Sequence, residues 1–230
     1  MDPYVKHVHD SFNLANRFSS NVNSEICAME GYSGWKTRHL YNNICKLVVS
    51  PDRKTEFLEV GSWKGSTIVA SLFGNESSTH GTCIDNWSEF GGPVDEFKAN
   101  LQKFNVNPTV IEGDFFKWDP ASLGHKVDIY LFDGTHTYDN HYRGMTHMWP
   151  ALNDKCIIIV DDWNWSYVRD GTLDAIRDMN CKIIEKFEVT HTNDDSHTPM
   201  YQIPGKNGGV TLSHAYTEFW NGCVVFVIEK

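Results

Sequence analysis

The stretch TEFLEVGSWKGST, residues 55–67, decides the fold of this chain. Its first half carries an apolar run, Phe57, Leu58 and Val60, that is typical of a short buried strand. Two glycines then break the pattern, and apolar residues at helical spacing resume over residues 66–73. A strand, a glycine turn and a helix in this order open a doubly wound α/β sheet. The turn places the free N–H groups of a helix N-terminus beside a backbone that a ligand can approach closely.

The spacing within the turn separates three classes of ligand site. A phosphate-binding P-loop needs Gly-Lys-Ser/Thr, whereas residues 64–66 read Lys-Gly-Ser, which excludes that loop. A dinucleotide-binding turn needs a glycine where Trp63 stands, so this indole argues against an NAD-linked oxidoreductase. What remains is the pattern E-x-G-x-x-x-G, formed by Glu59, Gly61 and Gly65.

Composition and charge restrict the classes of function. The chain has 230 residues, of which 40% are hydrophobic and 22% charged, and this fits a globular α/β protein. The sequence has no run of 18 apolar residues and no secretory signal, and its 6 cysteines form no C-x-x-C pair. A formal net charge of −10 disfavours contact with phosphate backbones. We therefore expect a cytoplasmic protein that binds neither nucleic acid nor membrane, and a homo-oligomer is compatible with these features.

The alternation of strands and helices divides the chain into two parts, residues 1–54 and residues 55–230. The first part is expected to be an N-terminal arm, polar and irregular over residues 1–24 and either ordered or frayed, followed by an entry helix over residues 35–49. Between them, residues 29–35 carry two glycines and no period, which fits either a helix-entry loop or a functional role. The second part is expected to be the α/β domain itself.

Acidic residues end or follow the next two predicted strands. Asp85 ends the strand of residues 81–85, at a sheet edge where a carboxylate can accept hydrogen bonds from both hydroxyls of a ribose. The alternative is a solvated aspartate. Trp87 either lies against a purine ring or caps the core. Asp114 follows the strand of residues 109–112, where it either accepts a hydrogen bond from an adenine amino group or forms a turn.

Carboxylates also follow two further apolar strands, residues 127–132 and 156–160. Asp133 follows the first strand, and Asp161 and Asp162 follow the second. Neighbouring strands lie roughly 4.8 Å apart, so we expect these carboxylates at one edge of the sheet. Clustered carboxylates repel one another unless a cation is present, and Mg²⁺ prefers oxygen ligands. The group therefore predicts a divalent metal site, and the alternative is that the aspartates cap helices or bind backbone N–H groups.

One histidine stands out from the other ten. His136 lies three residues after a strand-end aspartate, in a glycine turn. Imidazole is easily poised near neutral pH, which suits a general base. The alternative is a loop histidine packed on an aromatic ring. The polar loop of residues 193–214 is too long for a hairpin turn and is placed to cover a site.

Five short motifs follow one another along residues 29–230: EVGSWKG, CIDNW, EGD, LFDGTHTY and IIIVDDW. Together they resemble the class I S-adenosylmethionine (SAM) methyltransferases, and within these the small metal-assisted O-methyltransferases of the catechol and macrolide-sugar type. The resemblance implies a doubly wound, mostly parallel seven-stranded sheet of Rossmann-like order 3-2-1-4-5-7-6, with an antiparallel last strand. It also makes residues 55–230 the methyltransferase domain.

The resemblance further implies roles for individual residues. His136 would be the catalytic base, and Asp133, Asp161 and Asp162 would hold Mg²⁺ or Mn²⁺. SAM would lie over the glycine turn. The residues implied to bind it are Glu59, Gly61, Ser62, Gly65, Asp85, Asn86, Trp87, Asp114 and Asp133. One departure from the family pattern is Gly144, which interrupts the helix after the fourth strand and leaves its packing open.

We therefore expect a SAM-dependent O-methyltransferase that acts on a hydroxyl of a saccharide or another small molecule, assisted by a divalent metal. A histidine in a D-G-x-H segment is a feature of the sugar-modifying relatives, and Asp133 and His136 match it. Aromatic residues beside the predicted strand ends suit either sugar faces or planar aromatic acceptors. A metal-independent SAM methyltransferase stays open as an alternative, with an NAD-linked oxidoreductase less favoured.

Overall fold

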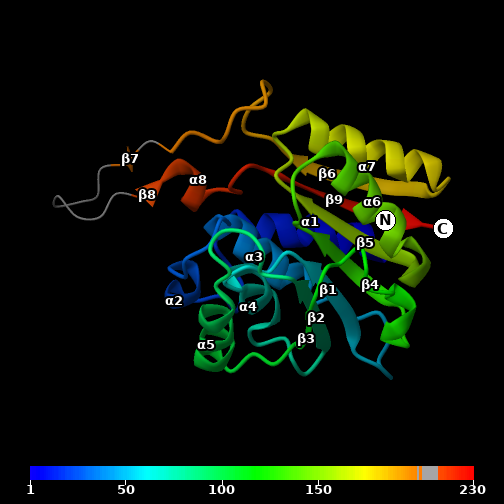
Figure 1. Cartoon of the computed structure of the whole chain (residues 1–230), viewed down its shortest axis with the longest axis horizontal. Helices are drawn as coiled ribbons and strands as arrows, with labels where there is room; N and C mark the ends of the chain where they lie inside the picture. Colours follow the sequence, from blue (N-terminus) through cyan, green and yellow to red (C-terminus); the bar gives the residue numbers. More distant parts are fainter. Residues whose placement is uncertain (201, 204–211) are drawn as a thin grey trace.

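Seven strands form one mixed sheet through the middle of the molecule (Figure 1). The computed structural model describes residues 1–200, 202–203 and 212–230. The strands follow the order β3-β2-β1-β4-β5-β9-β6, and within this sheet only β9 runs antiparallel to its neighbours. Their bounds are β1 Thr55–Val60, β2 Thr79–Asp85, β3 Thr109–Glu112, β4 Val127–Phe132, β5 Leu152–Asp161, β6 Lys182–Val189 and β9 Cys223–Glu229. The predicted order and the antiparallel last strand are confirmed.

Helices cover both faces of the sheet. The first face packs against α1, α3, α4 and α5, and the second face packs against α6 and α7. The bounds are α1 Pro3–Ala15, α2 Ser24–Cys27, α3 Trp35–Ile44, α4 Ser66–Leu72, α5 Val94–Phe104, α6 Tyr138–Met148, α7 Ser166–Asp178 and α8 His214–Thr217. Two 3₁₀ turns, η1 Pro120–Leu123 and η2 Trp149–Ala151, and a small ribbon, β7 Gln202–Ile203 with β8 Leu212–Ser213, complete the described elements.

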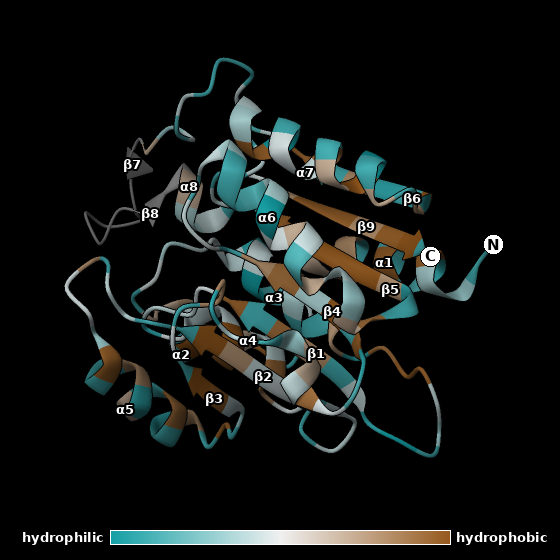
Figure 2. Ribbon diagram, turned by 45° about the vertical axis from the view of Figure 1, so that its right-hand side comes forward, coloured by the Kyte–Doolittle hydropathy of each residue, from teal (hydrophilic) through white to brown (hydrophobic). Residues whose placement is uncertain are grey.

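The central strands are apolar on both faces because helices cover both. Along β1, Phe57 joins the first core cluster and Leu58 the second; along β4, Leu131 and Tyr130 divide in the same way. Figure 2 shows the neighbouring central strands β5 and β9 largely in brown. Continuous apolar runs are typical of parallel strands buried on both faces, and this explains why the sequence shows them without alternation.

The N-terminal segment differs from the prediction of an irregular arm over residues 1–24. Residues Pro3–Ala15 form α1, and the Asp2 side chain caps it by accepting hydrogen bonds from the backbone N–H groups of Tyr4 and Val5. Its residue Val8 is fully buried, and the ring of Phe12 stacks on Phe187 of β6 with 5.8 Å between centroids. The prediction was wrong because the sheet supplies the apolar partner that holds this helix. A short amphipathic helix is marginal alone.

The structure shows how Gly144 is accommodated in the helix after β4. α6 continues through this glycine, and a Cβ built on it would lie 2.6 Å from the ring of Phe132. The Tyr130 hydroxyl also donates to the Gly144 carbonyl at 3.0 Å. Glycine therefore lets the helix approach β4 closely, and the helix is not interrupted. The predicted entry helix over residues 35–49 is shorter in the structure, since α3 ends at Ile44.

The loop predicted to cover a site is described only in part, because residues 201 and 204–211 lie outside the described residues. In the part of the chain that the structure describes, no helix is both long and apolar enough to cross a lipid bilayer.

Candidate active site

A cleft of about 680 Å³ opens at the carboxyl-terminal edge of the sheet, where β1, β2, β4 and β5 end. The strand order reverses between β1 and β4 at this edge, which is where ligands bind in open α/β sheets. Most of the predicted site residues line this cleft. They are Gly61, Ser62, Asp85, Asn86, Trp87, Asp114, Asp133, His136 and Asp162. Glu59, Gly65 and Asp161 are not among its lining residues.

The two glycines of the turn after β1 have different roles. Gly61 has φ +88° and lies so close to the Asp133 carbonyl that a Cβ would clash with it. Gly65 has φ +83°, and a Cβ there would lie 3.0 Å from the ring of Phe97 on α5. Gly61 thus allows β1 and β4 to meet at the cleft, whereas Gly65 allows α4 to begin against α5. Only Gly61 is a lining residue of the cleft.

Asp85 fixes the turn rather than standing free. Its Oδ2 accepts hydrogen bonds from the backbone N–H groups of Ser62 and Trp63, both at 2.8 Å, and its Oδ1 accepts one from Trp87 at 2.7 Å. A carboxylate offers about four lone-pair positions, so these bonds leave one for a ligand hydroxyl. Asp85 therefore connects the loops after β1 and β2, and it has room for one ribose hydroxyl rather than for two.

The other predicted SAM residues also hold their own loops. The indole of Trp87 donates to the Trp63 carbonyl at 2.8 Å and packs on Phe97 with 4.9 Å between ring centroids, so its ring belongs to the core and to the cleft wall. Asp114 accepts from the Phe116 backbone N–H at 3.0 Å, as a turn aspartate does, while it lines the cleft. The structure thus shows the core role of Trp87 and the turn role of Asp114, and their contacts with an adenine ring stay predictions.

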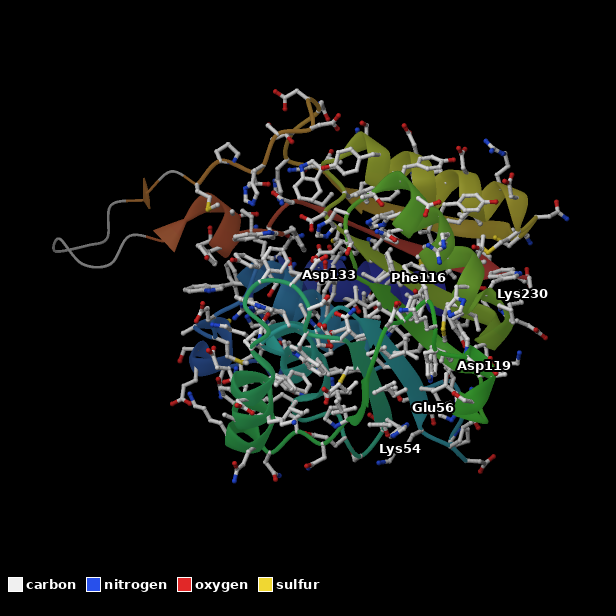
Figure 3. The ribbon with its side chains drawn as sticks, viewed as in Figure 1. Lys54, Glu56, Phe116, Asp119, Asp133 and Lys230 are labelled. Atoms are coloured by element: carbon white, nitrogen blue, oxygen red, sulfur yellow. The ribbon has the colours of Figure 1, made fainter. Side chains whose placement is uncertain are left out.

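His136 lies between two aspartates at the floor of the cleft. Its Nε2 is 2.7 Å from Asp162 Oδ2 and 3.4 Å from Asp133 Oδ1, and these ligand atoms lie within 4.8 Å of one another. Asn221 donates to the other oxygen of Asp162 at 2.7 Å, which fixes that carboxylate. The His136 ring also meets Trp165 edge-on at 5.1 Å. We call Asp133, His136 and Asp162 the cleft group; Figure 3 labels Asp133 among its surrounding side chains.

The charges of the cleft group depend on one another. Burial lowers the pKa of His136, but the hydrogen bonds and charges of Asp133 and Asp162 outweigh it and raise this pKa to about 11. Burial raises the pKa of Asp133, against the hydrogen bond from His136. In the absence of another cation, His136 is therefore an imidazolium, which cannot accept a proton. Its neighbour His141 is fully buried, and burial lowers the pKa of that imidazole to about 3.

Asp161 is not part of the cleft group. Its side chain is buried, neither of its carboxylate oxygens has a hydrogen-bond partner among the described residues, and burial raises its pKa well above the ordinary value. Successive residues of a strand point to opposite faces, and Asp162, with φ +56°, turns its carboxylate toward His136. The structure thus groups Asp133 and Asp162 with His136, and it leaves the predicted third ligand, Asp161, as an unpartnered carboxyl beside them.

These residues suit a divalent cation. Two carboxylates that line the cleft, together with an orphaned buried carboxyl beside them, offer the oxygen ligands that Mg²⁺ and Mn²⁺ prefer. A cation bound there would also replace the positive charge that His136 now supplies to Asp133 and Asp162.

The cleft has a wall that the sequence analysis left open. Tyr32, from the aperiodic segment ahead of α3, stacks on Trp63 with 4.8 Å between centroids and an angle of 16°. Phe90 and Trp220 lie 5.9 and 5.8 Å from the Tyr32 ring. Other lining residues missed from the sequence are Ser33, Thr67, Phe115, Phe116, Phe132, Asn140 and Asn221. For Tyr32 and Ser33, the two glycines of residues 29–35 were the signal in the sequence that could have predicted a role in the site.

A buried arginine holds this wall in place. The Nη1 of Arg38, on α3, donates to the carbonyls of Ile26, Cys27 and Met29 at 2.6, 3.0 and 3.0 Å, and its Nε donates to Ser33 Oγ at 2.9 Å. Burial lowers the pKa of Arg38 to about 10, so the guanidinium stays charged at neutral pH. The segment that carries Tyr32 is thereby attached to the first turn of the α3 helix and to the cleft.

A seven-stranded sheet of this order, with a glycine turn after β1 and a cleft at the switch point, defines the class I methyltransferase fold. Residues 58–163 match the family model described as a methyltransferase domain. No curated protein sequence matches the chain significantly.

Solved structures share this fold at low sequence identity. A precorrin-6y C5,15-methyltransferase from Geobacter metallireducens has a TM-score of 0.59 and 11% identity, over 94% of this chain and 96% of its own. An O-methyltransferase from Bacillus cereus, solved in complex with S-adenosylhomocysteine (SAH), has a TM-score of 0.53 and 14% identity, over 100% and 92%. A SAM-dependent O-methyltransferase from Thermotoga maritima has a TM-score of 0.52 and 14% identity, over 76% of this chain and 60% of its own. The family match supports a methyltransferase, and these structures show that the chain shares the methyltransferase fold.

Proposed function

We propose that this protein is an O-methyltransferase that transfers the methyl group of SAM to a hydroxyl of a small molecule, with a saccharide favoured, assisted by a divalent metal. The observation that carries the proposal is the cleft group: His136 lies between Asp133 and Asp162 in the same cleft as the glycine turn. A base and a cation site beside the cofactor turn are what methyl transfer to a weakly acidic oxygen requires.

The cleft residues divide the chemistry between them. A bound divalent cation would lower the pKa of a hydroxyl and neutralise the carboxylates that hold it. Asp133 and Asp162 would be its ligands, and the buried Asp161 carboxyl, which has no hydrogen-bond partner among the described residues, is the neighbour of Asp162 in the chain. With a cation on these carboxylates, His136 Nε2 would be placed to take the hydroxyl proton. The Asp85 bonds keep the glycine turn in a fixed position, and a methyl donor bound over this turn would be held with it.

The aromatic wall favours an acceptor with a flat apolar face. Tyr32, Trp63, Phe90 and Trp220 gather on one side of the cleft, and such rings pack on sugar C–H surfaces and on planar aromatic compounds. The D-G-x-H segment that carries Asp133 and His136 favours a sugar hydroxyl, because such a hydroxyl loses its proton less readily than a catechol does and needs the base more.

The test is an acceptor panel. Free sugars, nucleotide sugars, glycosylated small molecules and catechols are incubated with SAM and Mg²⁺, and SAH release is measured. We expect turnover on a saccharide that disappears in His136→Ala while SAM affinity, measured by calorimetry, stays near normal. Turnover on catechols alone, or a fully active His136→Ala protein, would overturn the sugar assignment. SAM binding that fails in the unaltered protein would overturn the cofactor assignment instead.

A further inference from the structure

A second group of ligand side chains lies at the opposite, amino-terminal edge of the sheet. Glu56 on β1, His80 on β2 and His125 before β4 bring one carboxylate oxygen and two imidazole nitrogens within 4.8 Å of one another. We call these three residues the amino-edge group. Five residues of extended chain separate Glu56 from Gly61, about 16 Å at ~3.3 Å per residue. Figure 3 labels Glu56 and Asp133 at the two ends of the central strands, so the group is separate from the cleft.

The fold, rather than a sequence motif, brings these three residues together. Glu56 and His80 are direct partners in the parallel pairing of β1 with β2, so their side chains project from the same face of the sheet. His125 comes from a different connection: it follows Gly124, whose left-handed backbone, φ +71°, ends η1 and turns the chain toward β4. Three separate parts of the chain thus converge on one point.

The contacts within the amino-edge group converge on one oxygen. Glu56 Oε2 lies 2.7 Å from His80 Nδ1 and 3.1 Å from His125 Nε2. The two imidazole rings meet at 72° with 6.0 Å between centroids, so they do not stack. The far nitrogen of His80, Nε2, lies 3.2 Å from Thr109 Oγ1 on β3. Metal-ligating histidines usually form a hydrogen bond through the ring nitrogen that does not bind the metal, and this bond orients the other nitrogen. The contact with Thr109 would orient His80 Nδ1 in the same way.

The neighbouring charges leave Glu56 available. The nearby cation, Arg53, is bound in a two-pronged pair by Asp128, at 2.6 Å and 2.8 Å. Asp128 also accepts the backbone N–H of Glu56 at 2.9 Å, which fixes the start of β1. The Glu56 carboxylate therefore has the two imidazoles as its side-chain partners, and both imidazoles reach solvent, with 37% and 35% of their side-chain surface exposed.

We propose that the amino-edge group binds a transition-metal ion of the zinc class through Glu56 Oε2, His80 Nδ1 and His125 Nε2, with solvent as a fourth ligand. Tetrahedral zinc with bonds of ~2.0–2.1 Å places neighbouring ligand atoms about 3.3 Å apart. The present separations of 2.7 and 3.1 Å from Glu56 Oε2 are shorter than that spacing by about 0.6 and 0.2 Å, which side-chain rotation can supply. Two imidazoles select zinc, copper or nickel over Mg²⁺, which prefers oxygen.

An ion at this position would connect β1, β2 and the segment that enters β4. Because it binds the folded chain, it raises the stability of the fold by mass action. It has no direct route to the cleft chemistry, and the cleft ligands are carboxylates that suit Mg²⁺. The two edges are therefore expected to discriminate between the two classes of ion.

The test separates the two edges by substitution. The cleft is silenced with Asp133→Asn and Asp162→Asn, and Zn²⁺ is titrated into this protein by calorimetry, with bound zinc measured by elemental analysis. We expect one Zn²⁺ per chain. His80→Gln and His125→Gln, added singly, each lower the affinity at least about tenfold, and together they abolish binding. His9→Gln, which replaces an exposed histidine of α1 elsewhere on the surface, is the matched control and keeps the affinity unchanged.

Three outcomes would overturn the proposal. One is that the cleft-silenced protein binds no Zn²⁺, and another is that the doubly substituted His80→Gln/His125→Gln protein binds it with unchanged stoichiometry and affinity. The third is that His9→Gln weakens binding as much as His125→Gln does. Folding is checked separately, because both histidines are partly exposed: circular dichroism and the Tm without zinc should match those of the parent, and only the rise in Tm on adding Zn²⁺ should be lost.

Discussion

The two edges of the sheet carry the same residue types in different surroundings. In the cleft group, the side chains of Asp162, Asp133 and His136 are 7%, 23% and 27% exposed. In the amino-edge group, Glu56, at 19%, is more buried than its two histidines. A charge in the cleft is therefore poorly screened by water, and the carboxylates raise the pKa of His136 to about 11. The difference between the edges lies in the number of carboxylates around each histidine: two carboxylates surround His136 in the cleft, whereas one carboxylate serves two histidines at the amino edge.

Backbone strain follows the same division. Among the described residues, the cleft is lined by Trp63, Trp87, Phe90, Asp162 and Trp220, which all have positive φ without being glycine. The amino-edge group contains no such residue. Strained conformations persist where the surroundings over-determine them, and they cluster at functional sites. This asymmetry supports the cleft as the place of catalysis and the amino edge as a binding site only.

The largest effect is expected when divalent metal is removed, and it is a loss of methyl transfer. Exhaustive chelation should reduce methyl transfer to background, because His136 then returns to an imidazolium between Asp133 and Asp162. SAH release measured before chelation, after it, and after Mg²⁺ is restored checks this. The His80→Gln/His125→Gln protein should lose and regain activity in the same way. Full turnover in the chelated enzyme would instead favour a metal-independent methyltransferase.

The second expected effect is the loss of the base. His136→Ala should lower kcat by about 10²–10⁴-fold, the usual contribution of a general base, with little change in SAM affinity. His125→Ala is the matched control from the other edge, and its kcat should equal that of the unaltered protein. Equal losses in the two variants would mean that the comparison between the edges is wrong.

The third effect concerns Glu59, which shares β1 with Glu56 but is fully buried and has no hydrogen bond with the described residues. Burial raises its pKa to about 8. Because the folded-state pKa is raised, this residue's contribution to stability is fully present below about pH 4.5 and is lost as pH rises through about 8. The loss is on the order of 3–5 kcal/mol, since each pKa unit corresponds to about 1.4 kcal/mol.

Urea unfolding measured from pH 5 to 8 checks this dependence on pH. The unaltered protein should lose stability as the pH rises, and Glu59→Gln should flatten the profile because glutamine does not titrate. Glu56→Gln, the matched change at the other end of β1, should keep the slope. A slope that survives in Glu59→Gln would assign the pH dependence to other buried groups.

The fourth effect concerns the attachment of the glycine turn. Asp85→Ala removes the acceptor of three backbone N–H groups, those of Ser62, Trp63 and Trp87. A hydrogen bond to a charged group contributes about 1.5–3 kcal/mol, so SAM affinity should fall about thirtyfold. Calorimetry with SAM measures this. Asp114→Ala should cost less, because Asp114 holds only its own turn; the reverse order would show that the adenine contact dominates.

The smallest expected effect is at the amino edge. Thr109→Val removes the hydroxyl 3.2 Å from His80 Nε2 and keeps the shape of the side chain. Outer partners of metal ligands typically contribute 10–100-fold in affinity, and a neutral hydroxyl belongs at the lower limit. Zn²⁺ affinity should therefore fall about tenfold, with kcat unchanged. A change in kcat would indicate that the two edges are coupled.

Much of the fold and part of the site could be predicted from local patterns. The apolar runs of the strands, the glycine at position 61 and the polar residues just past each strand end are all readable along the chain, because parallel strands are apolar throughout and bind ligands at one edge. Asp85, Asp133, Asp162 and His136 were located in this way, and all of them line the cleft.

Other features could not be predicted, because they depend on distant partners. The helix α1 is held by Phe187, far along the sequence from its own Phe12, and the role of Arg38 is set by the carbonyls that surround it. His80 and His125 meet only because β1, β2 and β4 lie side by side in the sheet.

The sequence by itself determined the positions of the strands, the glycine turn and which acidic residues end at the functional edge, since these follow from side-chain periodicity and backbone freedom within a few residues. The order of the strands in the sheet was implied by the resemblance to class I methyltransferases. Only the tertiary structure decided which of the two adjacent aspartates joins His136. Asp161 stays buried outside the cleft lining, and Asp162 lines the cleft with a positive φ and a hydrogen bond from Asn221. The tertiary structure also determines the charge of His136, because its pKa depends on burial and on neighbouring charges that the sequence pattern does not contain.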